Sequence, residues 1–225
     1  GVAMILFRVI DQEEAFASID FNVIFLLVGM MVIANVTGKT GVFQWLAIRS
    51  AKLAQGNAVA VLVILCTITA VGSAFLDNVT MVVLMAPLTL FVASTMELNP
   101  VPFLVSLIMA SNIGGTATLI GDPPNILIGS AADLDFISFL INVAPLTLII
   151  FMVFIASIVF FFRNELRASP ESRQRILDVD ESQVLTDKSL LRVSVAVLAF
   201  TAIGFLLHGV LDYEVATVAL LGATV

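Results

Sequence analysis

Long apolar runs, separated by short polar segments, dominate this chain of 225 residues. Between Lys52 and Glu97 the only charged residue is Asp77, and between Asp135 and Arg163 there is none. A bilayer core about 30 Å thick needs about 20 apolar residues for one helical span. The pattern therefore predicts an all-α, multi-pass integral membrane protein.

The runs divide the chain into predicted elements. The first ten residues are expected to be the tail of a span, and an acidic loop follows them. An amphipathic interfacial helix is expected over 37–57, where basic residues lie among aromatic and aliphatic ones. The polar segment 163–188 has no apolar periodicity and is predicted to be a linker. The runs that predict spans or parts of spans are 21–36, 137–162, 189–210 and 214–225.

Composition excludes several classes of protein. Apolar residues make up 60% of the chain and charged residues 12%, whereas a soluble domain has about 25% charged residues. The net charge of −7 leaves no basic surface for nucleic acid, so no nucleic-acid partner is expected. The single cysteine excludes an internal disulfide and a cysteine metal cluster.

The basic residues are unevenly distributed and predict an orientation. Nine of the ten lysines and arginines fall in the loops 37–57 and 163–192. Lysine and arginine concentrate in cytoplasmic loops of membrane proteins. We therefore expect these two loops to be cytoplasmic and the acidic loops to be external, in the plasma membrane of a prokaryote.

The block 58–95 is apolar except for the pair Asp77 and Asn78 near its centre. The limb after that pair contains Pro87 and would rise only about 24 Å as a helix, which is short for a full crossing. We therefore expect a re-entrant hairpin with its tip near the bilayer midplane. An ordinary turn between two spans is the alternative. A carboxylate at midplane depth is costly unless it binds a proton or a cation.

The block 101–132 is apolar but is interrupted by three glycines and a double proline. The glycines permit backbone conformations that a helix does not use, and the prolines have no N–H to donate. Two helical halves, 101–112 and 125–132, together rise about 30 Å, one core thickness. We expect a discontinuous helix whose free backbone groups could bind an ion, with a simple kink as the alternative. The side chains that add oxygen ligands there are Ser111, Asn112, Thr116, Thr118, Asp122 and Asn125.

Two segments carry a family resemblance: residues 73–80, SAFLDNVT, and residues 111–125, SNIGGTATLIGDPPN. They resemble the signature segments of the ion transporter superfamily, in its citrate-transporter-like branch with P-protein-like permeases, NhaD-type antiporters and ArsB-type permeases. The resemblance implies two inverted repeats, each with a re-entrant hairpin and an unwound helix. It implies a first repeat over 1–162, truncated at its N-terminus, a cytoplasmic linker over 163–188 and the truncated start of a second repeat over 189–225.

The resemblance also implies half of an ion or substrate site, made by the hairpin tip and the helix break. Dicarboxylate carriers of the superfamily have Ser-Asn-Thr at the tip, whereas this chain has Asp-Asn-Val-Thr at 77–80. The added carboxylate would repel an anionic substrate unless a cation lay between them. A Na⁺ ion is expected at Asn78, Thr80, Thr116, Asp122 and Asn125. The complete candidate set is Asp77, Asn78, Thr80, Ser111, Asn112, Gly115, Thr116, Thr118, Gly121, Asp122, Pro123, Pro124 and Asn125.

These features predict a secondary active transporter, a Na⁺/H⁺-coupled antiporter or an ion-coupled permease, and not an enzyme. Asp77 and Asp122 would alternate between proton and cation, so that replacing either by Asn should abolish Na⁺-dependent exchange. No cofactor is expected apart from a bound Na⁺. The expected partners are a small inorganic ion or small anion and the lipid bilayer, with a homodimer left open.

Three alternatives remain open at this point. The first is an arsenite or organic-anion permease of the same superfamily, and the second is a passive anion channel. The third, a remote one, is an intramembrane aspartyl protease, because paired carboxylates can share a proton and activate water. The two prolines directly after Asp122 argue against a catalytic aspartate carried on a helix.

Overall fold

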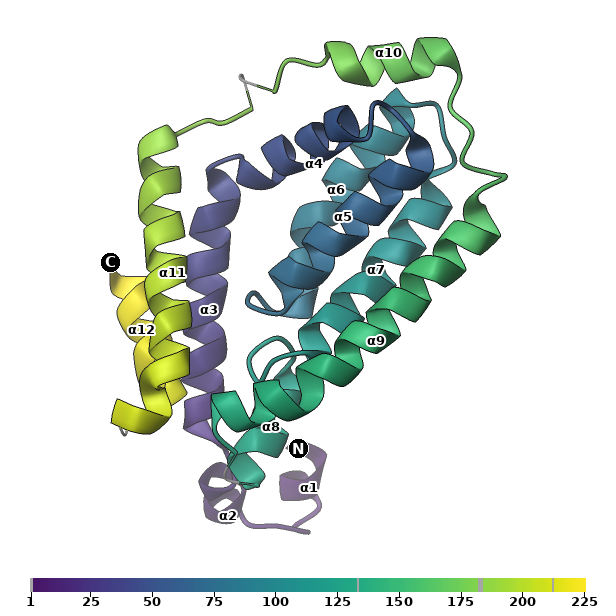
Figure 1. Cartoon of the computed structure of the whole chain (residues 1–225). Helices are drawn as coiled ribbons and strands as arrows, with labels where there is room; N and C mark the ends of the chain where they lie inside the picture. Colours follow the sequence, from purple (N-terminus) through teal and green to yellow (C-terminus); the bar gives the residue numbers. More distant parts are fainter. Residues whose placement is uncertain (1, 133, 182–183, 212) are drawn as a thin grey trace.

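The computed structural model describes residues 2–132, 134–181, 184–211 and 213–225, and the elements within these ranges are α-helices (Figure 1). In chain order they are α1 (Val2–Leu6), α2 (Gln12–Ala17), α3 (Phe21–Lys39), α4 (Val42–Leu53), α5 (Ala58–Ser73), α6 (Asn78–Thr95), α7 (Pro100–Thr116), α8 (Pro123–Ala131), α9 (Phe136–Phe162), α10 (Pro170–Asp178), α11 (Lys188–Leu211) and α12 (Val215–Thr224).

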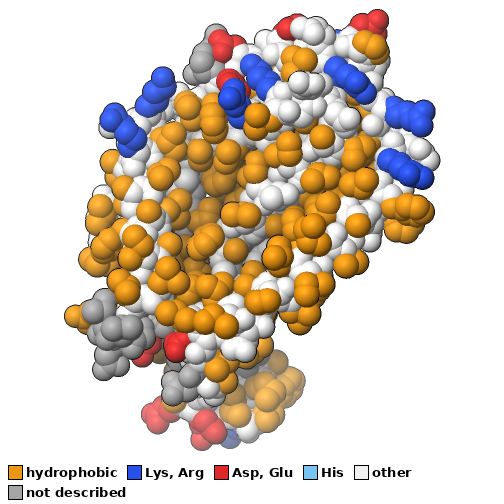
Figure 2. All heavy atoms as spheres, in the orientation of Figure 1, with side chains coloured by type: hydrophobic (Ala, Val, Ile, Leu, Met, Phe, Trp, Pro, Cys, Tyr) orange, Lys and Arg blue, Asp and Glu red, His pale blue; other side chains and the backbone are white. Residues whose placement is uncertain are grey.

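Four of these helices are long and apolar enough to cross a membrane: α3, α6, α9 and residues 188–207 of α11. Helix α6 was expected to be short for a full crossing, but it begins at Asn78 and has 18 residues. On the face shown in Figure 2, apolar side chains cover the middle of the molecule, and Lys and Arg side chains gather at the end where α4 and α10 lie. This end, residues 37–57, 163–181 and 184–192, is called the basic end below. The prediction of an all-α membrane protein is confirmed for the described part of the chain.

Two elements near the N-terminus differ from the prediction. The expected tail of a span is a helix of five residues, α1, which ends in a turn where Arg8 has a φ of 58°. The segment 37–57 is not one helix, because α3 continues to Lys39 before α4 begins at Val42. Gly41 makes the bend between them with a φ of 81°, which favours glycine over residues that have a Cβ.

The predicted linker contains a helix of its own, α10, although residues 182–183 lie outside the described ranges. The Ser169 hydroxyl accepts a hydrogen bond of 3.1 Å from the Ser172 amide, and Pro170 occupies the first turn, where a missing N–H is harmless. Ile176 is completely buried. A cap and one buried apolar side chain thus form a short helix that the missing periodicity did not predict.

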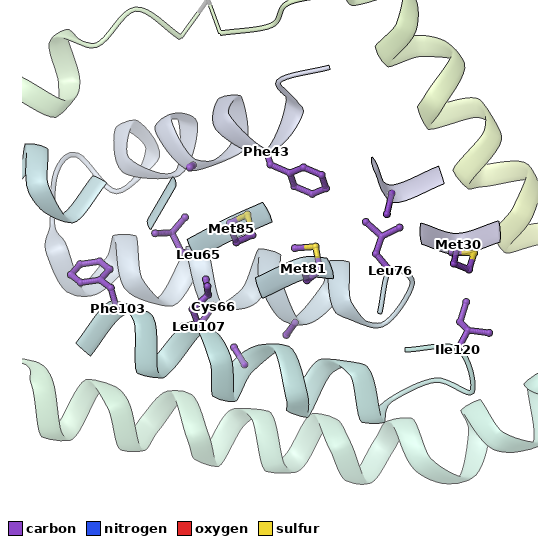
Figure 3. Packing of buried hydrophobic residues seen from close by; sticks show 14 of the residues in the cluster. Met30, Phe43, Leu65, Cys66, Leu76, Met81, Met85, Phe103, Leu107 and Ile120 are labelled. Carbon is purple, nitrogen blue, oxygen red and sulfur yellow. The ribbon is translucent and has the colours of Figure 1, made fainter. Parts of the chain in front are cut away.

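The helices pack in two groups (Figure 1). In the first, α3, α11 and α12 lie together, and a Cβ on Gly29 would be only 2.7 Å from the carbonyl carbon of Ala219. In the second, α5, α6 and α7 lie together with α9 packed against α7. Leu65, Met85 and Phe103 are buried in the core of this second group (Figure 3).

Candidate functional site

The turn between α5 and α6, residues 74–77, lies beside the middle of α3. Leu76 in this turn is buried close to Met30 and Ile120 (Figure 3). Phe75, the residue before it, lines a small cavity together with the same two residues. Met30 is the central residue of the 19-residue helix α3. The turn therefore lies half-way along a candidate membrane span.

Asp77 is a helix cap. One of its carboxylate oxygens, Oδ1, accepts a hydrogen bond of 2.9 Å from the Thr80 amide, and the other, Oδ2, accepts one from the Thr80 hydroxyl. Such a cap satisfies a free N–H group at the start of a helix, here α6. Asp77 is also buried, with 8% of its surface exposed. Both of its oxygens are thus engaged by a residue of its own helix.

The break in the second block is confirmed, but it is shorter than predicted. Helix α7 continues to Thr116 and α8 begins at Pro123, so the non-helical segment is 117–122 rather than 113–124. Pro123 and Pro124 occupy the first turn of α8, where proline is well tolerated because the N–H groups there have no partner within the helix. The prolines therefore start the second half-helix instead of ending the first.

The glycines at the break have a different role from the one predicted. Gly114 and Gly115 belong to α7, and positive φ angles among the described glycines occur at Gly41 and Gly56. A Cβ on Gly114 would lie 2.1 Å from the Ala70 carbonyl oxygen, and one on Gly115 would lie 2.6 Å from the Gly121 oxygen. These glycines allow close approach of backbones rather than unusual backbone angles.

Asn125 closes the break by bonding to the end of α7. Its amide nitrogen Nδ2 donates to the carbonyl oxygens of Gly115 at 3.2 Å and Thr118 at 2.9 Å. The last carbonyl groups of a helix have no partner within that helix and need one from outside when they are buried. Asn125 is itself buried, with 9% of its surface exposed. One side chain on α8 therefore satisfies a carbonyl in the last turn of α7 and another within the break.

Replacing Asn125 by Leu, which has a similar size but no amide, should lower the free energy of unfolding by about 2–4 kcal/mol, because buried carbonyls lose their donor. The measurement is a denaturant titration in mixed micelles, followed by the fluorescence of Trp45, the single tryptophan. Asn142→Leu is the control, because Asn142 is exposed and donates only to the Ser138 carbonyl of its own helix. Equal stability of the two variants would contradict the role of Asn125.

Hydrogen bonds also join the hairpin to the break. The Ser73 hydroxyl donates to the Ser111 carbonyl oxygen at 2.7 Å, and the Ser111 hydroxyl donates to the Asn78 carbonyl oxygen at 2.8 Å. The Asn78 amide N–H donates to the Gly121 carbonyl oxygen at 3.2 Å, and the Thr118 hydroxyl donates to that of Ala74. The two broken segments therefore form one connected unit.

Asn78 and Asp122 lie close together in this unit. The Asn78 side-chain amide donates to Asn112 Oδ1 at 3.0 Å and is near enough to the Asp122 carboxyl group to interact with it. Asp77 is near enough for its charge to act on Asp122. The other side-chain atom of Asn78, Oδ1, is buried and has no hydrogen-bond partner among the described residues. Asp122 precedes α8 but does not cap it. The Asn78 amide oxygen and the Asp122 carboxylate could thus act as ligands for a cation.

Most of the predicted site residues lie together in the structure, but several have a different role from the one expected. The Thr116 side chain is exposed, and its hydroxyl donates to the Asn112 carbonyl oxygen of its own helix at 2.9 Å. Gly115 and Gly121 contribute close backbone contact, and the prolines start α8. Ser73 was missed although it is completely buried between the segments. The signal for it was a hydroxyl at the last position of a mostly apolar helix.

A family model described as a citrate transporter matches residues 1–225. A 46 kDa membrane protein of Mycobacterium leprae is 41% identical over 99% of this chain and 53% of its own length. A protein named an uncharacterized transporter, from Mycobacterium tuberculosis strain H37Rv, is 43% identical over 96% of this chain and 51% of its own length. The human P protein is 42% identical over 52% of this chain and 14% of its own length. The chain spans about half the length of the mycobacterial relatives it matches.

These similarities show which kind of protein the chain resembles. The matched family and the names of the relatives indicate a transporter and not an enzyme, as predicted. The similarity to P protein confirms the resemblance to the ion transporter superfamily. The apolar helices make the chain an integral membrane protein. Because the family model matches the whole of it, the chain belongs to the citrate transporter family.

Proposed function

We propose that this chain forms the first half of a cation-coupled secondary transporter and that Asp122 and Asn78 bind the coupling cation, Na⁺ or a proton. The observation that carries the proposal is the Asp122 carboxyl group close to the Asn78 side chain, whose buried Oδ1 has no hydrogen-bond partner among the described residues. An ionisable residue inside a membrane segment marks an ion pathway in most cases, because its charge is costly there. A bound cation offsets the charges of Asp122 and the nearby Asp77.

The helix termini around the site support the same proposal. The first turns of α6 and α8 carry partial positive charge and stabilise the carboxylates of Asp77 and Asp122. Asp77 is engaged as the cap of α6, so the Asp122 carboxylate, which makes no cap hydrogen bond, remains to attract the cation. The other members of the predicted Na⁺ set donate hydrogen bonds within the protein: Thr80 to Asp77, Thr116 to Asn112, and the Asn125 amide nitrogen to Gly115 and Thr118. The buried Asn78 Oδ1 has no hydrogen-bond partner among the described residues, so we propose this oxygen and the Asp122 carboxylate as the ligands.

The position of the hairpin supports a re-entrant arrangement. Its turn packs beside Met30, half-way along α3, where an external loop would have to lie beyond the end of a span. We infer that residues 1–162 are one repeat of an inverted pair and that the second begins near 189. We also infer that the basic end faces the cytoplasm of a prokaryotic cell.

An organic-anion permease is the second candidate, because the matched family is described as a citrate transporter. Citrate carries several carboxylates, so that Asp122 would repel it without a cation. A citrate carrier at this site would therefore transport the anion together with a cation, and the same two residues would bind that cation.

The test uses proteoliposomes that contain the polypeptide at the length of its mycobacterial relatives. An imposed Na⁺ gradient should change the internal pH, read with an enclosed dye, and a choline gradient should not. Uptake of labelled citrate that depends on Na⁺ or on protons would favour the second candidate. An anion current without any cation dependence would overturn both and indicate a passive channel.

A further inference from the structure

A segment after α9 crosses the basic end and contacts two turns of the helical core. This segment, residues 169–181, contains α10 and is called the strap below. In Figure 1, α10 lies across the ends of α4, α5 and α6, and it packs against α4 and α6. Ile176 of α10 is completely buried and anchors the strap.

The turn between α4 and α5 lies under the strap. Gly56 in that turn has a φ of 68°, and a Cβ there would lie 2.9 Å from Cβ of Arg173. Arg49 of α4 forms an ion pair of 2.9 Å with Glu181 at the end of the strap. The turn and helix α4 thus hold the strap from one side.

The loop between α6 and α7 holds the strap from the other side. Glu97 in that loop accepts a hydrogen bond of 2.8 Å from the Ser172 hydroxyl and one of 2.5 Å from the Arg175 guanidinium. Arg175 and Ser172 together hold the pKa of the Glu97 carboxyl group below its ordinary value. Glu97 follows α6, whose other end is the hairpin tip, and precedes α7, whose other end is the break. The strap is therefore hydrogen-bonded to the loop that joins α6 and α7, the two helices that carry the candidate site.

Farther along the chain, residues 184–186 cover the turn between α3 and α4. The Thr186 amide donates to the Thr40 carbonyl oxygen at 3.1 Å. A Cβ on Gly41 would lie 2.0 Å from the Val184 oxygen. Gly41 and Gly56, the described glycines with positive φ, are thus both covered from this part of the chain. Two of the three turns have a glycine where a Cβ would collide with the covering chain, and the third is hydrogen-bonded to it. A helix that lay on the surface without a role in holding these turns would not need such close contacts.

The ion pair between the strap and the α6–α7 loop is exposed and can break without a large loss of stability. The side chains of Glu97 and Arg175 are each 56% exposed, and exposed ion pairs contribute little stability and are screened by salt. We propose that the strap is a releasable clamp, which holds the junction of α6 and α7 against α4 and so restrains the two helices that form the site. This regulation goes beyond ion binding and does not depend on which ion is bound.

Hydrogen exchange, measured by mass spectrometry on the 225-residue chain in lipid nanodiscs, tests this clamp. Ile176→Ala removes the buried anchor and should raise exchange in α10 by about 10-fold or more. The clamp also requires faster exchange at the last turn of α6, where the amides of Met96, Glu97 and Leu98 are hydrogen-bonded in the folded state. The control is Leu53→Ala, because Leu53 lies at the same end and is 66% exposed.

A second variant decides the matter if Ile176→Ala does not fold. Glu97→Gln should raise exchange in α10 by about two- to fivefold at low salt, and this difference should vanish near about 1 M salt. Glu165→Gln, an exposed acid before the strap, should leave exchange unchanged. Faster exchange confined to α10 would overturn the clamp, and so would unchanged exchange in both variants. Since no substrate is added, failure of the proposed ion binding would not alter these outcomes.

Discussion

Replacing Gly114 by Ala is expected to lower the free energy of unfolding by about 3 kcal/mol. The new Cβ would lie 2.1 Å from the Ala70 carbonyl oxygen and 2.4 Å from Ala70 Cα. Both are backbone atoms, so no rotation of a side chain can relieve the contact, and α5 and α7 must move apart. Alanine is the better helix former by about 1 kcal/mol, so the steric cost must exceed this gain. A denaturant titration followed by Trp45 fluorescence measures the change.

Gly38→Ala is the matched control. Gly38 is also inside a helix, α3, but a Cβ there would meet Cδ2 of Leu84 at 2.8 Å, the far end of a flexible side chain. The Leu84 side chain can rotate away, so we expect a change within about 0.5 kcal/mol of the native protein, or a small gain from helix propensity. Stability losses of equal size in both variants would mean that the crossing of α5 and α7 is no closer than an ordinary helix contact.

Three of the four candidate spans, α3, α9 and α11, and the two interrupted segments could be predicted from the sequence because each rests on a strong local signal, whereas α6 was expected to be too short for a full crossing. An uninterrupted apolar stretch as long as 137–162 predicts a helix that crosses the bilayer. Asp77 and Asp122 are conspicuous because they are isolated charges in apolar blocks. Both lie where the helices are interrupted, at the start of α6 and of α8.

The features that sequence reasoning missed depend on which helices become neighbours. Gly114 was interpreted as a source of backbone freedom, but its role is set by Ala70, a residue on another helix. The bonds between Ser73 and Ser111 join positions 38 residues apart. The helix α10 is held by Glu97, far from it in the sequence. Local patterns of polarity carry no information about such partners.

The two aspartates, which sequence reasoning treated alike, have different surroundings. Both carboxylate oxygens of Asp77 accept hydrogen bonds from Thr80, as a helix cap requires. Asparagine also caps helices well, so Asp77→Asn should keep the start of α6 intact. The Asp122 side chain makes no cap hydrogen bond and lies close to Asn78, whose Oδ1 has no partner among the described residues. We therefore expect the cation to depend on Asp122 far more than on Asp77.

Asp122→Asn should weaken Na⁺ binding by about 100-fold, equal to about 2.7 kcal/mol, because the carboxylate that binds the cation loses its charge. Binding is measured as the rise in unfolding temperature between choline and Na⁺ at equal ionic strength, since a ligand that binds only the folded state stabilises it. Asp77→Asn is the control and should keep Na⁺ affinity within about threefold of the native protein. Equal loss in both variants would show that the carboxylates bind the ion jointly. A normal Na⁺ response in Asp122→Asn would rule out Asp122 as the cation ligand, and the search would move to backbone carbonyls of the break.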